Sequence, residues 1–335
     1  MKLSLDPKAI NDVLDGHWAE ARRLGRTLAE ASSTHDDPAD DLDTARAKTL
    51  DGVMMMAETG LPMTGLSPEM GGKNEHATNV AGFEETVTAN PSLQIKAGVQ
   101  FGLFGGAILH LGNKEQHQKW LLDAQSGRLL GSFAMTEIGH GSDVANVATT
   151  ATYDEATEEF VIETPFRAAT KEYIGNAARD ARAAVVFAQL ITKGVKHGVH
   201  AFFVPVRDEA GEPMPGVSIE DDGYKGGLKG VDNGRLAFDS VRIPRANLLN
   251  RYGEVTADGT YSSPIESPGR RFFTMLGTLV QGRVSLDGAS VVASKIALDI
   301  AVRYGLERKQ FTAGDDFAET TLLDYGQHQR RLMPA

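Results

Sequence analysis

Cysteine is absent from this sequence of 335 residues. Without cysteine the chain has no disulfide scaffold, no zinc site with cysteine ligands, no iron–sulfur centre and no thiol catalysis. The lack of cysteine also fits a reducing compartment.

Basic residues are fewer than acidic ones, with 34 Lys and Arg against 45 Asp and Glu, which gives a formal net charge of −11. Such a balance argues against a nucleic-acid partner, which needs positive charge near phosphates. Long apolar runs are also missing, because none reaches the roughly 18 residues of a membrane-spanning helix. The stretch from Met1 to Trp18 turns polar after Leu5 and shows no signal peptide. We therefore expect a cytoplasmic protein with no membrane partner.

The composition that remains is ordinary for a globular protein, with 41% hydrophobic and 24% charged residues. The length predicts two domains, or three. The segment 1–130 has mostly helical periodicity, as in Leu14, Trp18, Ala21, Leu24 and Leu28. Further helices are expected at 45–57, 78–88, 98–111 and 114–122, with loops at 32–43 and 60–72.

The pattern changes near Gly131, where short β-rich runs alternate with turn signals. Strands are expected at 148–153, 159–163, 183–191, 199–206, 217–219 and 236–243. From Gly269 to Arg331 the pattern is helical again, with a final helix at 319–332. The fold class is therefore α+β. An N-terminal helical domain (1–130) precedes a central antiparallel β-barrel or sandwich (131–255), and the start of a helical bundle (256–335) follows.

Several catalytic motifs are missing, namely the P-loop, the Rossmann fingerprint, HExxH and GxSxG. His110 and His117 are seven residues apart in a helical segment, but without a third ligand they make a weak metal site. We expect no metal.

Two loops stand out at the edges of the β-rich part. Residues 133–143 combine hydroxyls, a carboxylate and glycines, and backbone amides in such a loop can donate to a cofactor or a phosphate. Residues 170–177 place an aromatic beside a glycine, which could form a wall against a flat ring. Each also has a plain structural interpretation: a turn that crosses between domains, and a β-bulge with a packed Tyr173.

The two loops belong to a longer pattern. The motifs MTEIGHGSDV (135–144) and ATKEYIGN (169–176) resemble the flavin loops of the acyl-CoA dehydrogenase and acyl-CoA oxidase superfamily. The segments KGVDNGRLAFDSVRIPRANLL, AVRYGLERKQF and LLDYGQHQRRLMP resemble the oxidases in particular. The resemblance runs from about Gly98 to the last residue, and residues 1–97 match more loosely.

The resemblance implies non-covalent FAD and a fatty acyl-CoA substrate, oxidised to the trans-2-enoyl-CoA while molecular oxygen becomes hydrogen peroxide. By position in the motifs, Thr136 and Gly175 would contact the flavin ring, and Gly175 would open space for oxygen beside it. Ser142 and Arg283 would lie near CoA.

The Arg-x-x-Phe pair Arg308 and Phe311 would reach the FAD of a neighbouring subunit, because a guanidinium fork suits a pyrophosphate. A homodimer follows. Plain surface or strand-entry positions remain the alternative for Ser142 and Arg308.

Family members are about twice as long as this chain, and their catalytic glutamate lies roughly a hundred residues beyond its last residue. We therefore assign no catalytic base here and expect the chain alone to be nearly inactive. It is either a C-terminally truncated oxidase or a naturally short protein without activity. A dehydrogenase that uses a protein electron acceptor and a non-catalytic flavin or acyl-CoA binding module stay open, and an interaction scaffold without flavin is the least favoured class.

Overall fold

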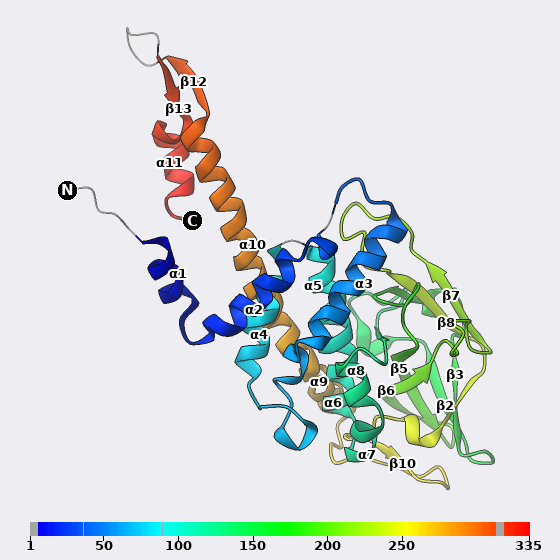
Figure 1. Ribbon diagram of the computed structural model, residues 1–335. Coiled ribbons are helices and arrows are strands. Elements are labelled where there is room, and N and C mark those ends of the chain that lie inside the picture. The colour runs from blue at the N-terminus through cyan, green and yellow to red at the C-terminus, as the bar shows by residue number, and fades with distance from the viewer. Residues whose placement is uncertain (1–5, 36, 89, 313–317) are drawn as a thin grey trace.

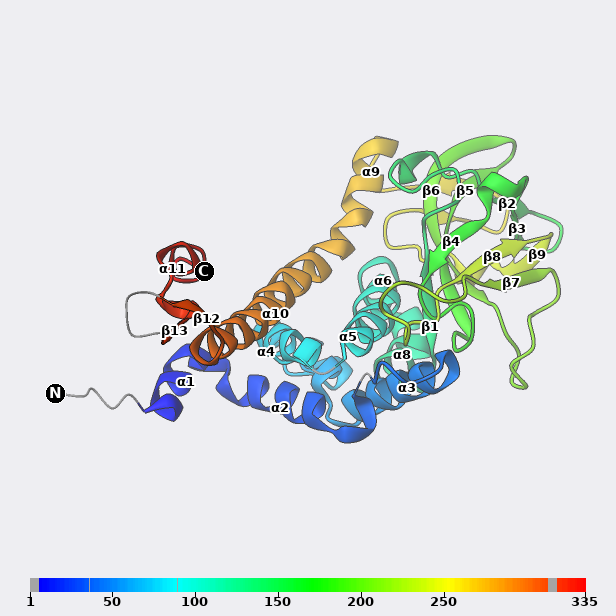
Figure 2. The same cartoon turned by 90° about the horizontal axis from the view of Figure 1, so that it is seen from above.

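A computed structural model describes residues 6–35, 37–88, 90–312 and 318–335. The N-terminal helices pack along one side of a β-domain, and a long helix leaves this body toward the C-terminus (Figure 1). Seen from above, that helix passes beside the N-terminal helices, and its far end lies away from the sheets (Figure 2).

The N-terminal part is helical, as expected. Its helices are α1 (Pro7–Asp15), α2 (Ala19–Glu30), α3 (Leu42–Glu58), α4 (His76–Glu84), α5 (Pro91–Ala97), α6 (Gly105–Leu111), α7 (Lys114–Gln116) and α8 (Leu122–Gln125). Side chains cap several of them, because Asp6, Asp41, Asn90 and Asn113 each accept a bond from a first-turn amide. The first helical pattern is interrupted at Gly16, which has a φ of 57°.

The expected helix at 98–111 contains a wide π-helical turn, η6 (Gly98–Phe104), between α5 and α6. A second one, η7 (His117–Leu121), follows α7. Such turns shift the side chains that follow around the helix axis and are frequent at functional sites. Periodicity predicted that both segments are helical but gave no sign of the π turns.

The β-rich part forms two main sheets. One contains β1 (Gly131–Ala134), β2 (Thr150–Asp154), β3 (Glu159–Glu163), β5 (Ala183–Thr192), β6 (Val195–Pro205) and β9 (Val241–Pro244). The other contains β4 (Lys171–Ile174), β7 (Val217–Asp221) and β8 (Gly234–Phe238). Most neighbours are antiparallel, as expected, but β5 pairs in parallel with both β1 and β2.

Two strands of the β-domain, β1 and β4, were not expected from the sequence, and the single strand expected at 236–243 is two strands. Residues Asp239 and Ser240 turn the chain between β8 and β9, and Ser240 has a φ of 53°. The apolar residues on the inner faces, such as Phe160, Phe202 and Phe238, form one buried core. The helical region packs a second core against the other face of β5 and β6.

The C-terminal part begins with two small strands, β10 (Glu254–Val255) and β11 (Tyr261–Ser262), and continues with α9 (Pro268–Met275) and α10 (Val280–Glu307). The helix expected at 319–332 is wrong in its first half. There β12 (Lys309–Thr312) pairs with β13 (Glu319–Thr321) in a hairpin, and only α11 (Gly326–Leu332) is helical. The β-branched pair Thr320 and Thr321 favours the strand. Residues 313–317 lie outside the described part.

The structure has the α+β class and the order of helices, sheets and helix that the sequence predicts. The domain boundaries at 130 and 255 stay a prediction. Across the described ranges, no helix has both the length and the apolar character needed to cross a membrane.

Candidate functional site

The two loops singled out in the sequence lie side by side. The Thr136 hydroxyl donates to the Glu172 carbonyl at 3.0 Å, and the Glu172 amide donates back to the Thr136 carbonyl at 3.2 Å. The Ile138 amide adds a bond to the Thr170 carbonyl at 3.0 Å. Residues 135–139 and 170–175 thus form one continuous wall, although they are far apart in the chain.

Behind this wall lies a buried ion pair. The ammonium of Lys171 is 3.1 Å from a Glu137 oxygen and also donates to the carbonyls of Met135 and Phe187. Glu137 in turn accepts the amides of Ala148 and Thr149 at 2.7 and 2.9 Å. The pair therefore fixes both ends of the loop that carries Thr136.

The environment shifts the pKa values of both partners. Burial lowers the pKa of Lys171 to about 8, although Glu137 opposes that change. Burial acts to raise the pKa of Glu137, but the charge of Lys171 and the donors at Ala148 and Thr149 outweigh it, so the pKa lies below its usual value. Near neutral pH the two groups form a charged pair.

The second loop bends sharply where β4 ends. Tyr173 has a φ of 58° and is 64% exposed, while Asn176 has a φ of 66°. The Ser132 hydroxyl donates to the Gly175 carbonyl, and the Asn176 amide group donates to the Gly131 carbonyl. The loop is thereby held against β1 with an aromatic side chain left exposed beside Gly175.

Gly175 faces the helical part of the molecule. A Cβ built on it would lie 2.8 Å from a methyl of Val99 on η6. In this structure the glycine therefore makes room for Val99, whereas the sequence led us to expect open space at this position.

A cavity of about 360 Å³ lies between the helix formed by α5, η6 and α6 and the first turns of α10, and Val99 is among its lining residues. Apolar side chains and glycines make up most of its wall, including Ile95, Val99, Leu103, Gly106 and Leu286. No Asp or Glu is among the described residues that line it. Such a space suits a flexible apolar chain.

Of the six expected site residues, Arg283 is among those that line this cavity. Gly175 meets the lining residue Val99, and Thr136 lies on the same wall as Gly175. Ser142 is exposed in the turn that follows Thr136, and its carbonyl accepts the Val144 amide at 3.0 Å. The loop position of Ser142 agrees with the sequence, but no contact ties its side chain to the cavity wall within the described residues.

The other two, Arg308 and Phe311, lie at the opposite end of α10. They follow Arg283 by about 25 residues or more, which corresponds to roughly 38 Å along a helix. Both are exposed, Phe311 by 73%, and Phe311 has a φ of 58°. They are therefore remote from the cavity of their own chain.

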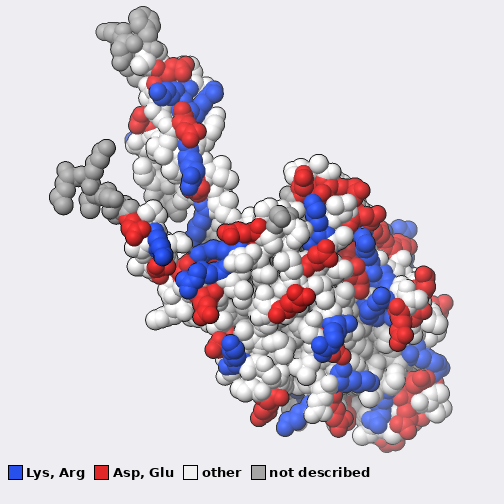
Figure 3. Space-filling view, in the orientation of Figure 1, with Lys and Arg blue, Asp and Glu red and all other residues white. Residues whose placement is uncertain are grey.

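The histidines noted in the sequence do not come together as ligands. His117 contacts the carbonyls of Ile108 and Leu109, and burial lowers the pKa values of His110 and His117. The described residues contain no group of three metal-ligating side chains. Acidic and basic residues are intermixed over the face shown in Figure 3.

Sequence reasoning missed the ion pair, and of the cavity it gave only the helix at 98–111, part of which lines it. The segment from Val99 to Gly106 does carry a signal. Its glycines Gly102 and Gly106 are four residues apart, and glycines so spaced in a helix leave a groove along one face. Glu137 and Lys171 carry none, because their pairing depends on tertiary structure.

Three family models match the chain. They are the acyl-CoA dehydrogenase N-terminal domain at residues 19–128, the acyl-CoA dehydrogenase middle domain at 132–241 and the acyl-CoA oxidase C-alpha1 domain at 276–335. Together they reach from the second helix to the last residue.

Curated relatives include acyl-coenzyme A oxidase 3 and acyl-coenzyme A oxidase 2 of Arabidopsis thaliana, both named as peroxisomal. They are 47% and 49% identical over 243 and 259 residues, which cover 72% and 75% of this chain. The matches cover only 36% and 37% of those relatives. The chain thus spans little more than a third of their length.

Solved structures agree. Acyl-CoA oxidase 3 of Yarrowia lipolytica has a TM-score of 0.84 and 33% identity, over 98% of this chain and 46% of that one. An acyl-CoA oxidase of Caenorhabditis elegans, solved with FAD, ascaroside-CoA and ATP, has a TM-score of 0.79 and 29% identity, over 98% and 48%. The similarity therefore includes the helical part that the sequence matched loosely.

Proposed function

Because the chain belongs to the acyl-CoA dehydrogenase and acyl-CoA oxidase superfamily, we propose that it supplies the flavin-binding and acyl-binding parts of an acyl-CoA oxidase. The reaction is the oxidation of a fatty acyl-CoA to the trans-2-enoyl-CoA, with molecular oxygen reduced to hydrogen peroxide. The oxidase-specific match at 276–335 and the names of the relatives support the oxidase assignment over the dehydrogenase.

The wall at Thr136 and Gly175 fits FAD. The Thr136 hydroxyl uses its proton on Glu172, so its oxygen is left to accept a bond from a ring N–H. The exposed side chain of Tyr173 and the half-buried Gly175 would offer a surface for the flat ring. When bound, FAD would accept the hydride from the β-carbon. The residues of this chain would hold and orient it.

The cavity carries the proposal. It is mostly apolar, its lining residue Val99 meets Gly175, and Arg283 lies in its wall. An acyl chain placed there would have its thioester near the proposed ring wall, and the cationic Arg283 is suited to the phosphates of CoA. Ser142, exposed in the same loop as Thr136, would contact the CoA arm.

Removal of the α-proton requires a base, and the cavity provides none within the described residues, because no carboxylate lines it. We propose that the base comes from polypeptide outside this sequence. General-base catalysis contributes about 10²- to 10⁴-fold, so the chain alone should turn over very slowly. The same observation favours a second candidate function, a flavin or acyl-CoA binding module without catalysis.

The remote position of Arg308 and Phe311 supports a homodimer, in which this pair would reach the FAD of the neighbouring subunit. The compartment is a separate matter. The Arabidopsis relatives are named as peroxisomal, so a peroxisome competes with the expected cytoplasm, and the location of a fluorescent fusion decides between the two.

The first experiment is a visible absorption spectrum of the purified chain together with its intact mass. Flavin bands with the mass of 335 residues would support the assignment of Thr136 and Gly175. A colourless sample that also fails to take up added FAD would contradict it. If flavin is bound, the next assay adds polypeptide that carries a base and measures turnover of the acyl-CoA in air. Peroxide formation separates the oxidase from a dehydrogenase. An absence of turnover supports the binding module.

Gly175 offers a second test of the oxidase assignment. If the glycine gives oxygen access beside the ring, reduced flavin bound to a Gly175→Thr variant should react more slowly with oxygen. Since the new side chain would also press on Val99, the variant is compared with Gly175→Thr combined with Val99→Ala. If reduced flavin reacted with oxygen at an unchanged rate in both variants, oxygen access at Gly175 would lose its support.

A further inference from the structure

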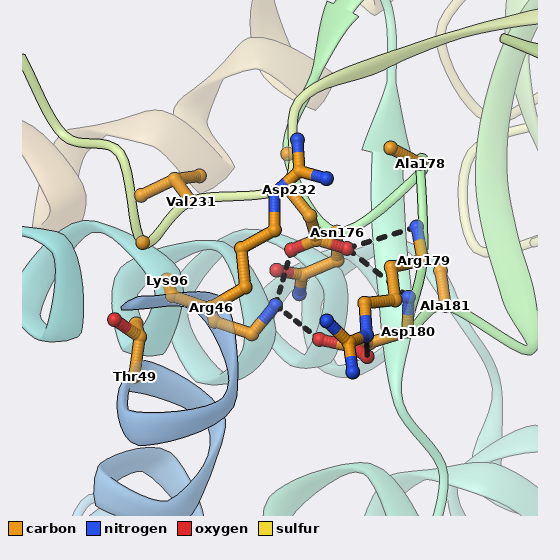
Figure 4. Close-up of polar contacts among 12 residues, drawn as sticks. Arg46, Thr49, Lys96, Asn176, Ala178, Arg179, Asp180, Ala181, Val231 and Asp232 are labelled. Atoms are coloured by element: carbon orange, nitrogen blue, oxygen red, sulfur yellow. Dashed lines mark hydrogen bonds and ion pairs between the residues drawn. The ribbon is translucent and has the colours of Figure 1, made fainter. Parts of the chain in front are cut away.

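A buried charge cluster joins the cavity helix to the loop that follows Gly175. The ammonium of Lys96, in the last turn of α5, pairs with Asp180 at 2.7 Å and with Asp232 (Figure 4). The side chains of Lys96 and Asp232 are 1% and 0% exposed. Arg179 adds a second cation 3.8 Å from Asp180, so two cations and two carboxylates meet in this cluster.

Asp232 connects the cluster to the backbone of the loop. One of its oxygens accepts the amides of Arg179 and Asp180, each at 3.0 Å, while its carbonyl accepts the Ala178 amide at 3.2 Å. The loop 175–181 directly continues the turn at Tyr173 and Gly175. A shift of Asp232 would therefore be passed to that turn.

Lys96 is also the first of three residues on the face of the helix that packs against the sheet. Four residues further on, Gln100 accepts the Gly131 amide at 2.9 Å and donates to the carbonyls of Ala124 and Leu129. Phe104, after four more, lies against Gly131 so closely that this glycine has no room for a Cβ. Positions 96, 100 and 104 thus fix the helix to the β-domain, and the neighbouring face lines the cavity.

From these contacts we propose that Lys96 is a positioning residue: by pairing with Asp180 and Asp232, it sets the spacing between the cavity helix and the wall at Gly175. A buried ion pair is a poor source of net stability, but it specifies one geometry well. The spacing that it specifies is tight, since Val99 leaves no room for a Cβ on Gly175. The importance of this spacing for a bound flavin and acyl chain rests on the proposed function, whereas the spacing itself does not.

The test is a thermal-unfolding cycle on the full chain. Gly175→Ala adds a methyl 2.8 Å from Val99 at a backbone conformation that alanine accepts, because the φ of Gly175 is not positive. In the parent we expect the Tm to fall by about 3–6 °C. In the Lys96→Met/Asp232→Asn background, which leaves the net charge of the cluster unchanged, the helix can retreat, and we expect less than half of that fall. Equal falls in the two backgrounds would overturn the proposal.

Two controls make the cycle specific. Val99→Ala removes the contact, so Gly175→Ala should then cost little, and a full cost there would overturn the proposed contact. Arg22→Met breaks an ion pair with Glu84 and Glu85 elsewhere in the helical part. In that background Gly175→Ala should cost as much as in the parent. A smaller fall in Tm there would mean that any destabilised background accommodates the added methyl, which would contradict a specific role of Lys96.

FAD titration adds a readout that a purely stabilising residue would not change. If the parent binds FAD, the folded Lys96→Met/Asp232→Asn variant should bind it at least about tenfold more weakly, and unchanged affinity would argue against a role in positioning the wall. If the parent binds no FAD at all, the proposed function fails while the unfolding cycle still decides the spacing.

Discussion

At the scale of single residues, the wall beside the cavity depends on ionised groups that sequence alone does not pair. Lys171 and Glu137 lie 34 residues apart and are both fully buried. Replacing Lys171 with methionine keeps much of its volume but leaves the Glu137 carboxylate buried without a cation. We expect a loss of about 3–5 kcal/mol in the free energy of unfolding, measured by urea denaturation.

A double variant, Lys171→Met with Glu137→Gln, serves as the control. It leaves no uncompensated charge, so it should recover most of the stability that the single variant loses. If the single variant were as stable as the parent, the pair would not hold the loop of Thr136, and that part of the site description would be wrong.

His200 makes a residue-scale prediction about pH. Burial lowers its pKa to about 4. Its Nε2 lies 2.9 Å from the Tyr261 hydroxyl and its Nδ1 3.0 Å from the Gly198 carbonyl, which fits a neutral ring. The unfolded chain binds the proton near pH 6.5, so the folded state is penalised as the pH falls from 6.5 toward 4. The free energy of unfolding should drop by about 3 kcal/mol over this range from His200 alone.

The measurement compares urea unfolding of the parent and His200→Gln between pH 4 and 7. Glutamine can make both hydrogen bonds but does not titrate, so the variant should show a flatter profile. Burial also lowers the pKa of His197, but this residue is less buried, so His197→Gln should flatten the profile less than His200→Gln does. Parallel profiles for the parent and His200→Gln would contradict the burial argument.

At the scale of elements, the cavity helix uses glycines where a helix would prefer alanine. Gly102 and Gly106 have nothing within 4 Å of an added Cβ, and both line the cavity. A glycine inside a helix costs about 1 kcal/mol relative to alanine, so the open space is kept although it weakens the helix. The width of the cavity is thus a property of this one element.

Gly106→Leu should fill part of the cavity. We expect affinity for a long-chain acyl-CoA to fall at least about tenfold, while affinity for butyryl-CoA changes by less than about twofold, as measured by calorimetry. Gly226→Leu is a matched control, since Gly226 also has open space around it but lies in an exposed loop outside the cavity. An equal loss for both chain lengths would mean that the cavity does not hold the acyl chain.

The elements themselves were predictable where a periodic pattern is long. The N-terminal helices and the long strands β5 and β6 follow directly from their apolar spacing. Short strands such as β1 and β4 were missed, because so short a segment carries too little pattern. The hairpin of β12 and β13 lies where the sequence predicts helix, since alternation over so few positions cannot be told from a helical pattern.

At the scale of the whole molecule, the candidate site could be predicted only in part. Motif spacing pointed to Thr136 and Gly175 as parts of one site, and the fold places their loops side by side. Of the cavity only the helix at 98–111 was predicted, and the cluster around Lys96 was not predictable, because both form between segments far apart in the sequence, such as those of Lys96 and Asp180. Which contacts such segments make is decided by packing, and packing leaves no local signal in the sequence.

The same scale gives the last prediction, which concerns α10. This helix is about 42 Å long, yet only Ser285, Ala289, Val292 and Gly305 are buried along it. In its far half Ile300 and Tyr304, four residues apart on one face, are 62% and 57% exposed. An apolar face of this kind indicates association. We expect the chain to run as a dimer or larger species in size-exclusion chromatography with light scattering.

Ile300→Lys with Tyr304→Lys should shift that species toward the monomer, because two charges would have to be buried in the contact. Ser290→Lys with Ser294→Lys adds the same charge at exposed polar positions of the same helix and should leave the mass unchanged. A parent that is monomeric at about 50 µM, a concentration well above a micromolar Kd, would show that this face has no partner in the chain itself. In that case the exposed apolar residues of α10 would be contacts for polypeptide outside the sequence, and the dimer proposed from Arg308 and Phe311 would lose its support.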